Sequence, residues 1–496
     1  KLDRAIMVVL ALALGYFAFD KFVLTPQREF AQLQQQKVEL EEARQIGRTE
    51  ALVESYGDKS IAVLPFADMS PEGDQAYFSD GITEELLNVL AGLNELRVIS
   101  RSSSFALRDD GLSIPEVADK LNVAYVLEGS VRKAGNQVRI TAQLIEAHSD
   151  THLWSQTYDR KLDSIFQIQD EIAGAVVDGL KITLLGAIPQ PRKTDPEVYS
   201  LYLQGKYFMT PPRQSKEDME KSVSAFQQVL AIDPDYAPAW TGLSWNYEYQ
   251  RRYHFLPEEQ AIELSREAAE RALAIDDNLA LAWSTLSYLR SKYDWDWEGA
   301  EAAMDKALQL EPNNSDVLLG TGSVASTLGQ LDRSIELLEH AVALDPLGLE
   351  GLASLARRYG IRGRHDEALE IHRRILVLFP EDTWTPEAIA ETYLRQGNPE
   401  RALDEMNKLP YSHRLNSLKA EALFIMGREE ESRALTSEFL NTPAEFGPFA
   451  KAAIYAWRGE NDDAFKSLEL AFEAHNRALA NILIFDAFRH LEADPR

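Results

Sequence analysis

Few residues are candidates for catalysis or for binding a metal or cofactor, and their spacing in the sequence is not that of a catalytic site. His148 and His152 are four apart, but they fall in a predicted hairpin, where two metal ligands at this spacing do not converge. Gly320 and Gly322 imitate a dinucleotide-binding loop. No strand precedes these glycines, and Gly322 lies where close packing of two helices needs a small residue. Neither pattern predicts a metal or cofactor site.

Adjacent carboxylates are a second candidate for chemistry. The pairs Glu84-Glu85 and Glu429-Glu430 are predicted to be solvated helix faces rather than acid/base partners. The chain has no cysteine, which excludes disulfides, thiol nucleophiles and Cys-based metal sites. It contains no phosphate-binding loop, kinase loop or Ser-centred elbow. We therefore predict a protein that is not an enzyme, with no catalytic residues, no cofactor and no metal.

The strongest pattern is a repeat that would position binding residues. Pro312, Pro346 and Pro380 are each 34 positions apart, and each closes a block of two predicted helices. In the second block Ala356 and Ala368 are small where the two helices must approach, and Gly363 breaks the first helix. This period resembles that of tetratricopeptide repeat (TPR) hairpins, which stack into a solenoid because one hairpin cannot bury its apolar face alone.

The same pattern extends in both directions and predicts an all-α TPR solenoid of about eight hairpins over residues 195–496, with Asp195 capping its first helix. Aligned to the TPR pattern, the inner face of the first helices would expose a candidate partner-binding groove of Trp245, Tyr249, Tyr288 and Arg357. Aromatic and Arg side chains are the usual anchors of protein interfaces. The alternative is that these side chains stack between hairpins as core.

Composition limits the partners and the number of domains. At 496 residues the chain is too long for one core, and its net charge is −28. This charge argues against nucleic acid as a partner, because phosphate binding needs concentrated Lys and Arg. We expect protein partners.

The N-terminus predicts membrane attachment. Ala5 to Leu24 is an apolar run about as long as a bilayer core, so residues 1–25 are predicted to be a transmembrane anchor. A cleaved signal peptide and a buried core helix are the alternatives. Lys1 and Arg4 favour a cytoplasmic N-terminus. We expect a single-pass protein of a Gram-negative inner membrane with its bulk in the periplasm, and both chain ends resemble cuts through a longer protein.

Between the anchor and the solenoid, residues 26–57 are predicted to be a polar helical stalk, 58–187 a small α/β domain and 188–194 a linker. In the α/β domain, 60–66 and 96–103 are predicted strands, and Asp80 or Thr83 is expected to cap a helix that starts near Ile82. The YFSDGITEE stretch has two interpretations, a helix cap with a turn glycine or a contact surface. Ser113 is expected to cap a second helix, and a hairpin is predicted to turn at 134–136.

These segments carry a family resemblance. The strings SIAVLPF, YFSDGITEELLN, LRVISRSSSF, AYVLEGSVRKAGNQVRITAQLIEA, THLWSQTYDR and IFQIQDEIA resemble the TolB amino-terminal-like (FlgO-like) domain of proteobacterial membrane-anchored TPR proteins. In that family the domain follows a transmembrane helix and precedes TPR repeats, and the order here is the same. Some relatives carry a cyclase, winged-helix or kinase module before the helix.

Three functions follow from this organisation. The first is a periplasmic scaffold that docks protein partners through the TPR groove and the α/β domain. The second is the periplasmic sensory half of a signalling protein whose cytoplasmic module lies outside this chain. The third is stable membership of a larger membrane complex, as an accessory subunit.

Overall fold

The computed structural model describes residues 59–93, 96–108, 111–162, 165–180, 194–209, 215–410, 412–441, 447–485, 487–488 and 491. The predicted anchor (1–25) and stalk (26–57) lie outside the described residues, as do all but one residue of the predicted linker (188–194). Within the described part, no helix combines the length and the apolar character needed to cross a bilayer.

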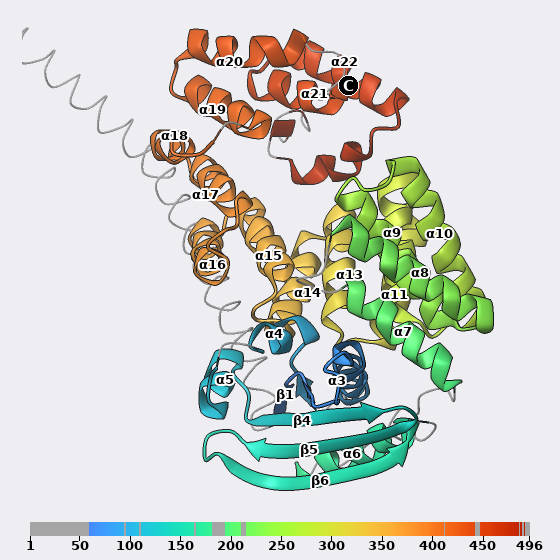
Figure 1. Ribbon diagram of the computed structural model, residues 1–496. Coiled ribbons are helices and arrows are strands. Elements are labelled where there is room, and N and C mark those ends of the chain that lie inside the picture. Colours follow the sequence, from blue (N-terminus) through green and yellow to red (C-terminus); the bar gives the residue numbers. More distant parts are fainter. Residues whose placement is uncertain are drawn as a thin grey trace, which may run out of the picture. The chain divides into compact units, whose positions relative to one another are not determined.

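The first described region, which we call the sheet domain (Ser60–Gly179), is built on one mixed sheet (Figure 1). Its strands run in the order β3-β1-β4-β5-β6, and β2 pairs with β4 beside this path. The pairs of β1 with β3 and β4 are parallel, whereas β4, β5 and β6 form an antiparallel meander. The strands are β1 Ser60–Val63, β2 Ala67–Asp68, β3 Arg97–Val98, β4 Tyr125–Ala134, β5 Gln137–Glu146 and β6 Thr151–Lys161.

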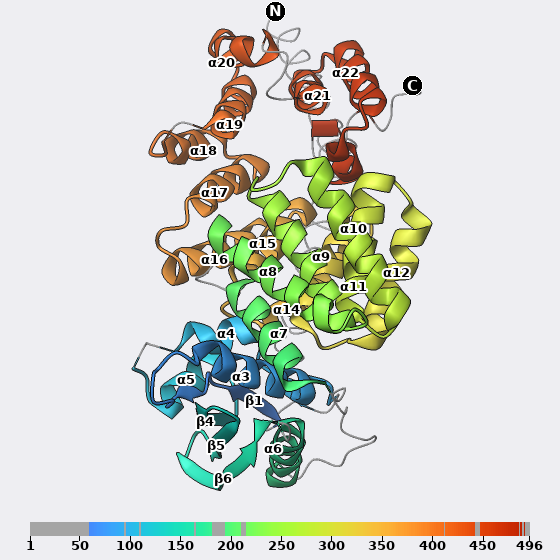
Figure 2. The same cartoon turned by 45° about the vertical axis from the view of Figure 1, so that its right-hand side comes forward.

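Helices cover both faces of this sheet. On one face α3 (Ala76–Ala91) and α6 (Ile165–Gly179) share a core with β1, β4 and β5, and Figure 2 shows α6 beside β6. On the other face α5 (Ile114–Leu121) packs around buried Ile99, together with Leu107, which follows α4 (Arg101–Ala106). The predicted α/β character, the hairpin turn at 134–136 and the cap at Ser113 are confirmed, since Ser113 forms a capping box with Glu116.

Two local predictions in this domain are wrong. Residues 96–103 do not form one strand, because β3 ends at Val98 and α4 begins at Arg101. Asp80 and Thr83 lie inside α3 rather than at its start. Thr83 accepts a hydrogen bond from the Phe66 amide at 3.0 Å and donates to the Ser79 carbonyl at 2.9 Å. Its side chain therefore binds the loop between β1 and β2 to helix α3.

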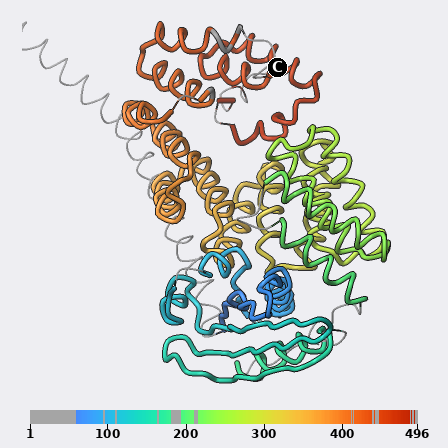
Figure 3. The backbone as a smooth tube through the Cα atoms, in the orientation of Figure 1, coloured from blue at the N-terminus to red at the C-terminus, as the bar shows by residue number. Residues whose placement is uncertain are grey.

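The second region, which we call the solenoid (Pro196–Ile484), is a succession of helical hairpins that can be followed along the chain in Figure 3. Consecutive helices from α7 to α22 pack in pairs, which gives eight hairpins in the described residues and confirms the predicted number. The first helices of most neighbouring hairpins also pack against one another. The helices are α7 Pro196–Met209, α8 Lys216–Ile232, α9 Ala237–Arg252, α10 Glu258–Ile275, α11 Ala280–Leu289, η3 Arg290–Asp294, α12 Trp297–Leu310, α13 Ser315–Thr327, α14 Leu331–Leu344, α15 Leu349–Arg362, α16 His365–Leu378, α17 Trp384–Arg395, α18 Pro399–Met406, α19 His413–Ile425, α20 Glu429–Asn441, α21 Gly447–Trp457, α22 Asn461–Glu473 and η4 Arg477–Ile484.

Small residues allow the two helices of a hairpin to approach, as the repeat predicted. In the first regular block, a Cβ on Gly322 would lie 3.0 Å from Leu338 Cγ. Ser334 Oγ donates to the Gly322 carbonyl at 2.6 Å, so the helices are also joined by a hydrogen bond. Gly363 ends α15 at φ 91°, a conformation that favours glycine. Gly320 and Gly322 lie inside helix α13, where they cannot form a dinucleotide loop.

The sheet domain and the solenoid meet at two places. Helix α7 packs on α3, where a Cβ on Gly81 would lie 2.6 Å from Leu203 Cδ1. Gly81 is therefore a contact glycine within a helix and not a turn glycine. Glu84 and Glu85 are not solvated as predicted: Lys206 Nζ lies 2.6 Å from Glu84 and 3.8 Å from Glu85 at this contact. The second meeting place is the loop between α14 and α15.

Candidate functional site

The four residues predicted to line a partner-binding groove lie on three first helices of the solenoid. Trp245 and Tyr249 are half-buried on α9, Tyr288 is half-buried on α11, and Arg357 is exposed on α15. No hydrogen bond or ring contact in the described part of the chain joins any two of them. They therefore do not form one anchor cluster, and each has to be considered with its own neighbours.

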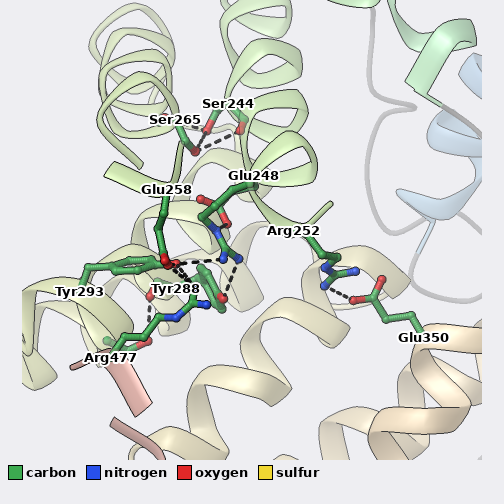
Figure 4. Close-up of polar contacts among 11 residues, drawn as sticks. Ser244, Glu248, Arg252, Glu258, Ser265, Tyr288, Tyr293, Glu350 and Arg477 are labelled. Carbon is green, nitrogen blue, oxygen red and sulfur yellow. Dashed lines mark hydrogen bonds and ion pairs between the residues drawn. The ribbon is translucent and has the colours of Figure 1, made fainter. Parts of the chain in front are cut away.

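Tyr249 begins an aromatic ladder at the end of α9. Its ring stacks on Tyr253 at a centroid distance of 5.0 Å, and Tyr253 stacks on Phe255 at 5.9 Å. Tyr253 is 44% exposed, so the ladder reaches solvent. The neighbouring Arg252 pairs with Glu350 on α15, which joins two helices that are 98 positions apart (Figure 4).

Tyr288 belongs to a polar cluster centred on Arg251. Figure 4 labels other members of this cluster, Glu248, Tyr288 and Tyr293. Arg251 donates through Nε to Glu248 at 3.0 Å and through Nη2 to the Tyr288 hydroxyl at 3.3 Å. Its guanidinium also lies over the ring of Tyr293, 5.8 Å from the centroid. Burial lowers the pKa of Arg251, but Tyr288 and Glu248 beside it raise this pKa more, so the net shift is above the usual value. Tyr288 is thus a member of an internal polar network and not a free anchor. One atom of this network, Glu248 Oε1, is buried without a hydrogen-bond donor.

The C-terminal segment of the chain closes over this cluster. Arg477, at the start of η4, donates to Glu258 on α10 and to the Tyr293 hydroxyl at 3.4 Å. Trp295 stacks on His475 at 4.3 Å between ring centroids and on Phe472 at 5.5 Å. The chain itself therefore covers the part of the first-helix face that carries Tyr288.

At the second contact between the sheet domain and the solenoid, three serine hydroxyls surround one carboxylate. Ser100, Ser102 and Ser103 each donate a side-chain hydrogen bond to Asp345, at 2.5, 2.6 and 2.5 Å. Arg97 Nη1 adds a bond to the Ala343 carbonyl at 2.9 Å. These bonds hold α4 on the α14–α15 loop.

Glu84 supports the other contact. Burial raises the pKa of its carboxyl, but Lys206 and Arg101 lower it more strongly, so the net shift is downward and Glu84 is held charged. Arg101 lies 3.2 Å from Glu84, which ties α4 and α7 to the same carboxylate. The two contacts together make the sheet domain and the solenoid one packed body.

The described residues around these contacts provide packing surfaces and charged groups, and they are not arranged to make or break a covalent bond. They include no group of three or more His, Asp or Glu side chains that could hold a metal ion. His148 and His152 are both exposed on or beside the edge strand β6. Sequence reasoning did not single out Arg251. Its position two residues after Tyr249, next to Arg252 and Tyr253, was the available signal.

Comparison with known families identifies both regions. Residues 57–175 match the family described as "HilA/YgeH-like transcriptional regulator, second domain". Residues 316–346 match the tetratricopeptide repeat family. The chain therefore contains a HilA-like domain and, after it, a tetratricopeptide repeat.

Two curated proteins share parts of the chain. A putative adenylate cyclase 3 from Rhizobium meliloti is 41% identical over 189 residues, which are 37% of this chain and 32% of that protein. The human protein O-mannosyl-transferase TMTC1 is 28% identical over 135 residues, 26% of this chain and 15% of that protein. The matched segments thus span a third or less of either relative.

Solved TPR structures are also similar. A tetratricopeptide repeat protein from Parabacteroides merdae matches 55% of this chain and 100% of its own, with 14% identity and a TM-score of 0.36. PilW, described as a type IV pilus biogenesis factor, matches 45% of this chain and 99% of its own, with 17% identity and a TM-score of 0.37.

Proposed function

We propose that this chain is a protein-interaction scaffold whose solenoid binds protein partners through the aromatic ladder Tyr249–Tyr253–Phe255 and the neighbouring Arg252. The observation that carries the proposal is the ladder itself, since its middle ring, Tyr253, is 44% exposed while Tyr249 and Phe255 on either side of it are half-buried. Tyr and Arg are the residue types that most often anchor protein interfaces. The rings are already stacked, so little side-chain entropy is lost on binding.

The test is a pull-down of the detergent-extracted protein from its own membranes, analysed by mass spectrometry. We expect proteins at fixed ratio to the bait, and we expect the double variant Tyr249→Ala/Tyr253→Ala to lose them. Trp384→Ala is the control, because Trp384 is 70% exposed on α17, away from the ladder. Equal recovery of partners with the double variant would contradict the proposal, and so would a bait that brings down no protein above background.

We also propose that residues 1–25 anchor this scaffold in the inner membrane, with residues 26–57 as a stalk and the bulk in the periplasm. The apolar run from Ala5 to Leu24 supports the proposal. The chain has no cysteine, so one cysteine at the exposed position Lys466 gives a clean probe of location. We expect Lys466→Cys to react with a membrane-impermeant maleimide in cells with a permeabilised outer membrane. Labelling only after the inner membrane is broken would contradict it.

We also propose a family for the region that contains the sheet domain. We infer that residues 58–187 are a TolB amino-terminal-like domain, with 188–194 as its linker to the solenoid at 195–496. The sequence strings that carry this resemblance support the inference, and the match to the HilA/YgeH-like second domain covers nearly the same range, 57–175. A crystal structure of residues 58–187 superposed on both families would decide between them.

A second function is favoured by the relatives. The match to a putative adenylate cyclase and the match to a transcriptional-regulator family both suit the sensory half of a signalling protein. In that case a cyclase, winged-helix or kinase module would precede Lys1. Sequencing the reading frame upstream of Lys1 separates the two functions: such a module supports the sensory role, and a short hydrophobic unit supports the scaffold.

A further inference from the structure

Among the described residues, the sheet domain has one long edge strand that pairs on one side only. Strand β6 pairs with β5, and Figure 1 shows β6 at the outer edge of the sheet. Nine of its eleven residues are exposed. At the opposite edge β3 has only two residues, and the solenoid covers the chain beside it, where the Ser100 amide donates to the Leu344 carbonyl at 2.8 Å. Within the described part of the chain, β6 is therefore the edge at which another strand can pair.

The register of β6 with β5 identifies the backbone groups that point outward. The Leu162 amide donates to the Asn136 carbonyl at 3.1 Å, and hydrogen-bonded pairs of an antiparallel ladder recur at every second residue. The even-numbered residues of 154–160 therefore point their amide and carbonyl groups toward β5. The odd-numbered residues between them point these groups away from β5, and they are Ser155, Thr157 and Asp159. The Asp159 carbonyl accepts a hydrogen bond from the Arg160 side chain at 3.0 Å, as expected for a group on the open side.

The central part of this edge lacks the features that usually prevent pairing. Natural edge strands are protected by Pro, by Lys or by an inward-pointing charge. Residues 154–158 of β6 read WSQTY and contain none of these. A β-bulge between Leu144 and Ile145 of β5 leaves Leu153 as an extra residue in β6. Because a bulge disrupts the ladder locally, the regular part of β6 begins at Trp154.

We propose that β6 pairs with β6 of a second copy of this chain, antiparallel and about a twofold axis at Thr157. This register pairs residues 154–160 of both copies, and it sets the outward backbone groups of Ser155 against those of Asp159 of the second copy. No like charges are directly opposite one another, whereas a register centred on Asp159 would bring two carboxylates together. Thr157 would meet its own copy on the exposed face, where its hydroxyl already lies 3.1 Å from the Thr141 hydroxyl of β5.

Charge favours a second copy of this chain at this edge. Residues 125–161, which form β4 to β6 and their turns, contain five Lys and Arg against four Asp and Glu, a net charge of +1. The whole chain has a net charge of −28, so two copies repel one another over most of their surface. The meander is a part of the chain where a second copy can approach without that repulsion. Homo-oligomers are most often twofold dimers, in which one surface patch meets itself.

The absence of cysteine from the chain permits a direct test by disulfide trapping. Opposed residues of a hydrogen-bonded antiparallel pair have Cα atoms about 5.5 Å apart, which suits a disulfide. We expect full-length Thr157→Cys, expressed in its own cells and oxidised before purification, to form a covalent dimer of twice the chain mass. Ser155→Cys is the matched control on the same exposed face. Its two copies would lie about 13 Å apart along the strands, so we expect it to stay monomeric.

Sedimentation equilibrium of the purified chain measures the same association without a cross-link. We expect a wild-type dimer, and we expect its dissociation constant to rise roughly tenfold or more in Thr157→Lys, because two ammonium groups would meet at the axis. Ser155→Lys adds the same charge but places it opposite Asp159 of the second copy, so it is expected to keep the dimer. Both positions are exposed, so neither lysine is expected to disturb the fold.

Three results would overturn the proposal. They are a monomeric wild type, equal dissociation constants for the two lysine variants, and equal cross-linking of the two cysteine variants. A cross-link from Thr157→Cys to a different protein would also contradict it, because the edge would then bind another partner. The test does not depend on the Tyr249–Tyr253–Phe255 ladder, since all four variants change the sheet domain.

Discussion

At the residue scale, the structure places charges and glycines where the sequence pattern gives little sign of them. The repeat predicted which positions are small, and Gly322 and Gly363 confirm it. It did not predict the role of Gly81, whose neighbour Leu203 is 122 positions away. Nor did it single out Arg358, one residue after the predicted Arg357. On a helix, adjacent residues face directions about 100° apart, and only the packing of neighbouring helices decides which one is buried.

The buried ammonium of Lys292 makes a prediction about pH. Burial, with Arg358 and Arg477 nearby, lowers the pKa of Lys292 to about 7, whereas a lysine in the unfolded chain titrates near about 10.4. Between these values the unfolded state binds more protons, so this residue makes stability rise as pH increases from about 7 to about 10. Below pH 7 its cost is present in full.

We therefore expect Lys292→Met to be more stable than the wild type at low pH, and to lose that advantage as pH rises. Urea unfolding across this pH range, in buffer without phosphate or sulfate, measures the difference. Lys466→Met is the control and is expected to follow the wild-type curve. Parallel curves for Lys292→Met and the wild type would show that the buried ammonium is not destabilising.

Gly81 gives a second prediction at this scale. A methyl group at Gly81 would lie 2.6 Å from Leu203, so Gly81→Ala must push α7 away from α3. We expect it to lower the free energy of unfolding by about 1–3 kcal/mol, as overpacking usually does. Gly174, inside α6, has open space around its Cβ position. Gly174→Ala is expected to be neutral or to stabilise by up to about 1 kcal/mol. Equal effects of the two substitutions in urea unfolding would refute the close contact.

At the element scale, the period of 34 predicted the helices of the solenoid because each hairpin is a local unit. The long strands β4, β5 and β6 were predictable for a similar reason, since neighbouring strands of a meander are close in sequence. The secondary structure of residues 96–103 could not be predicted in this way, because it depends on a contact with a residue far away in the sequence. Ser100, Ser102 and Ser103 gather around Asp345, about 245 positions away, and this contact favours a short helix over a longer strand.

Asp345 therefore carries a prediction about how the elements are joined. Asp345→Ala would leave the hydroxyls of three serines without their shared acceptor. We expect a loss of on the order of 3 kcal/mol, because the part-buried donors lose their acceptor together. Hydrogen exchange is expected to become faster in α4 before it changes in β4 and β5. Asp332→Ala, at an exposed ion pair on α14, is the control, and the interpretation fails if both variants behave alike.

At the scale of the whole molecule, the sheet domain and the solenoid form one body, and the C-terminal segment closes on the middle hairpins. The repeat could predict a stack of hairpins but not this closure, because Arg477 and Glu258 are 219 positions apart. The closure covers Tyr288 and leaves the Tyr249–Tyr253–Phe255 ladder open to solvent. A partner would therefore meet the end of α9 and not the predicted groove as a whole.

The most direct measurement places a photo-crosslinking amino acid at Tyr253 and, as a control, at Lys466, in the protein expressed in its own cells. Both positions are exposed, but only Tyr253 lies on the ladder. Our account predicts that irradiation joins position 253 to a distinct protein in high yield, and that position 466 gives no such product. Identical products from both positions, or none from position 253, would contradict the claim that the ladder is where this scaffold binds its partner.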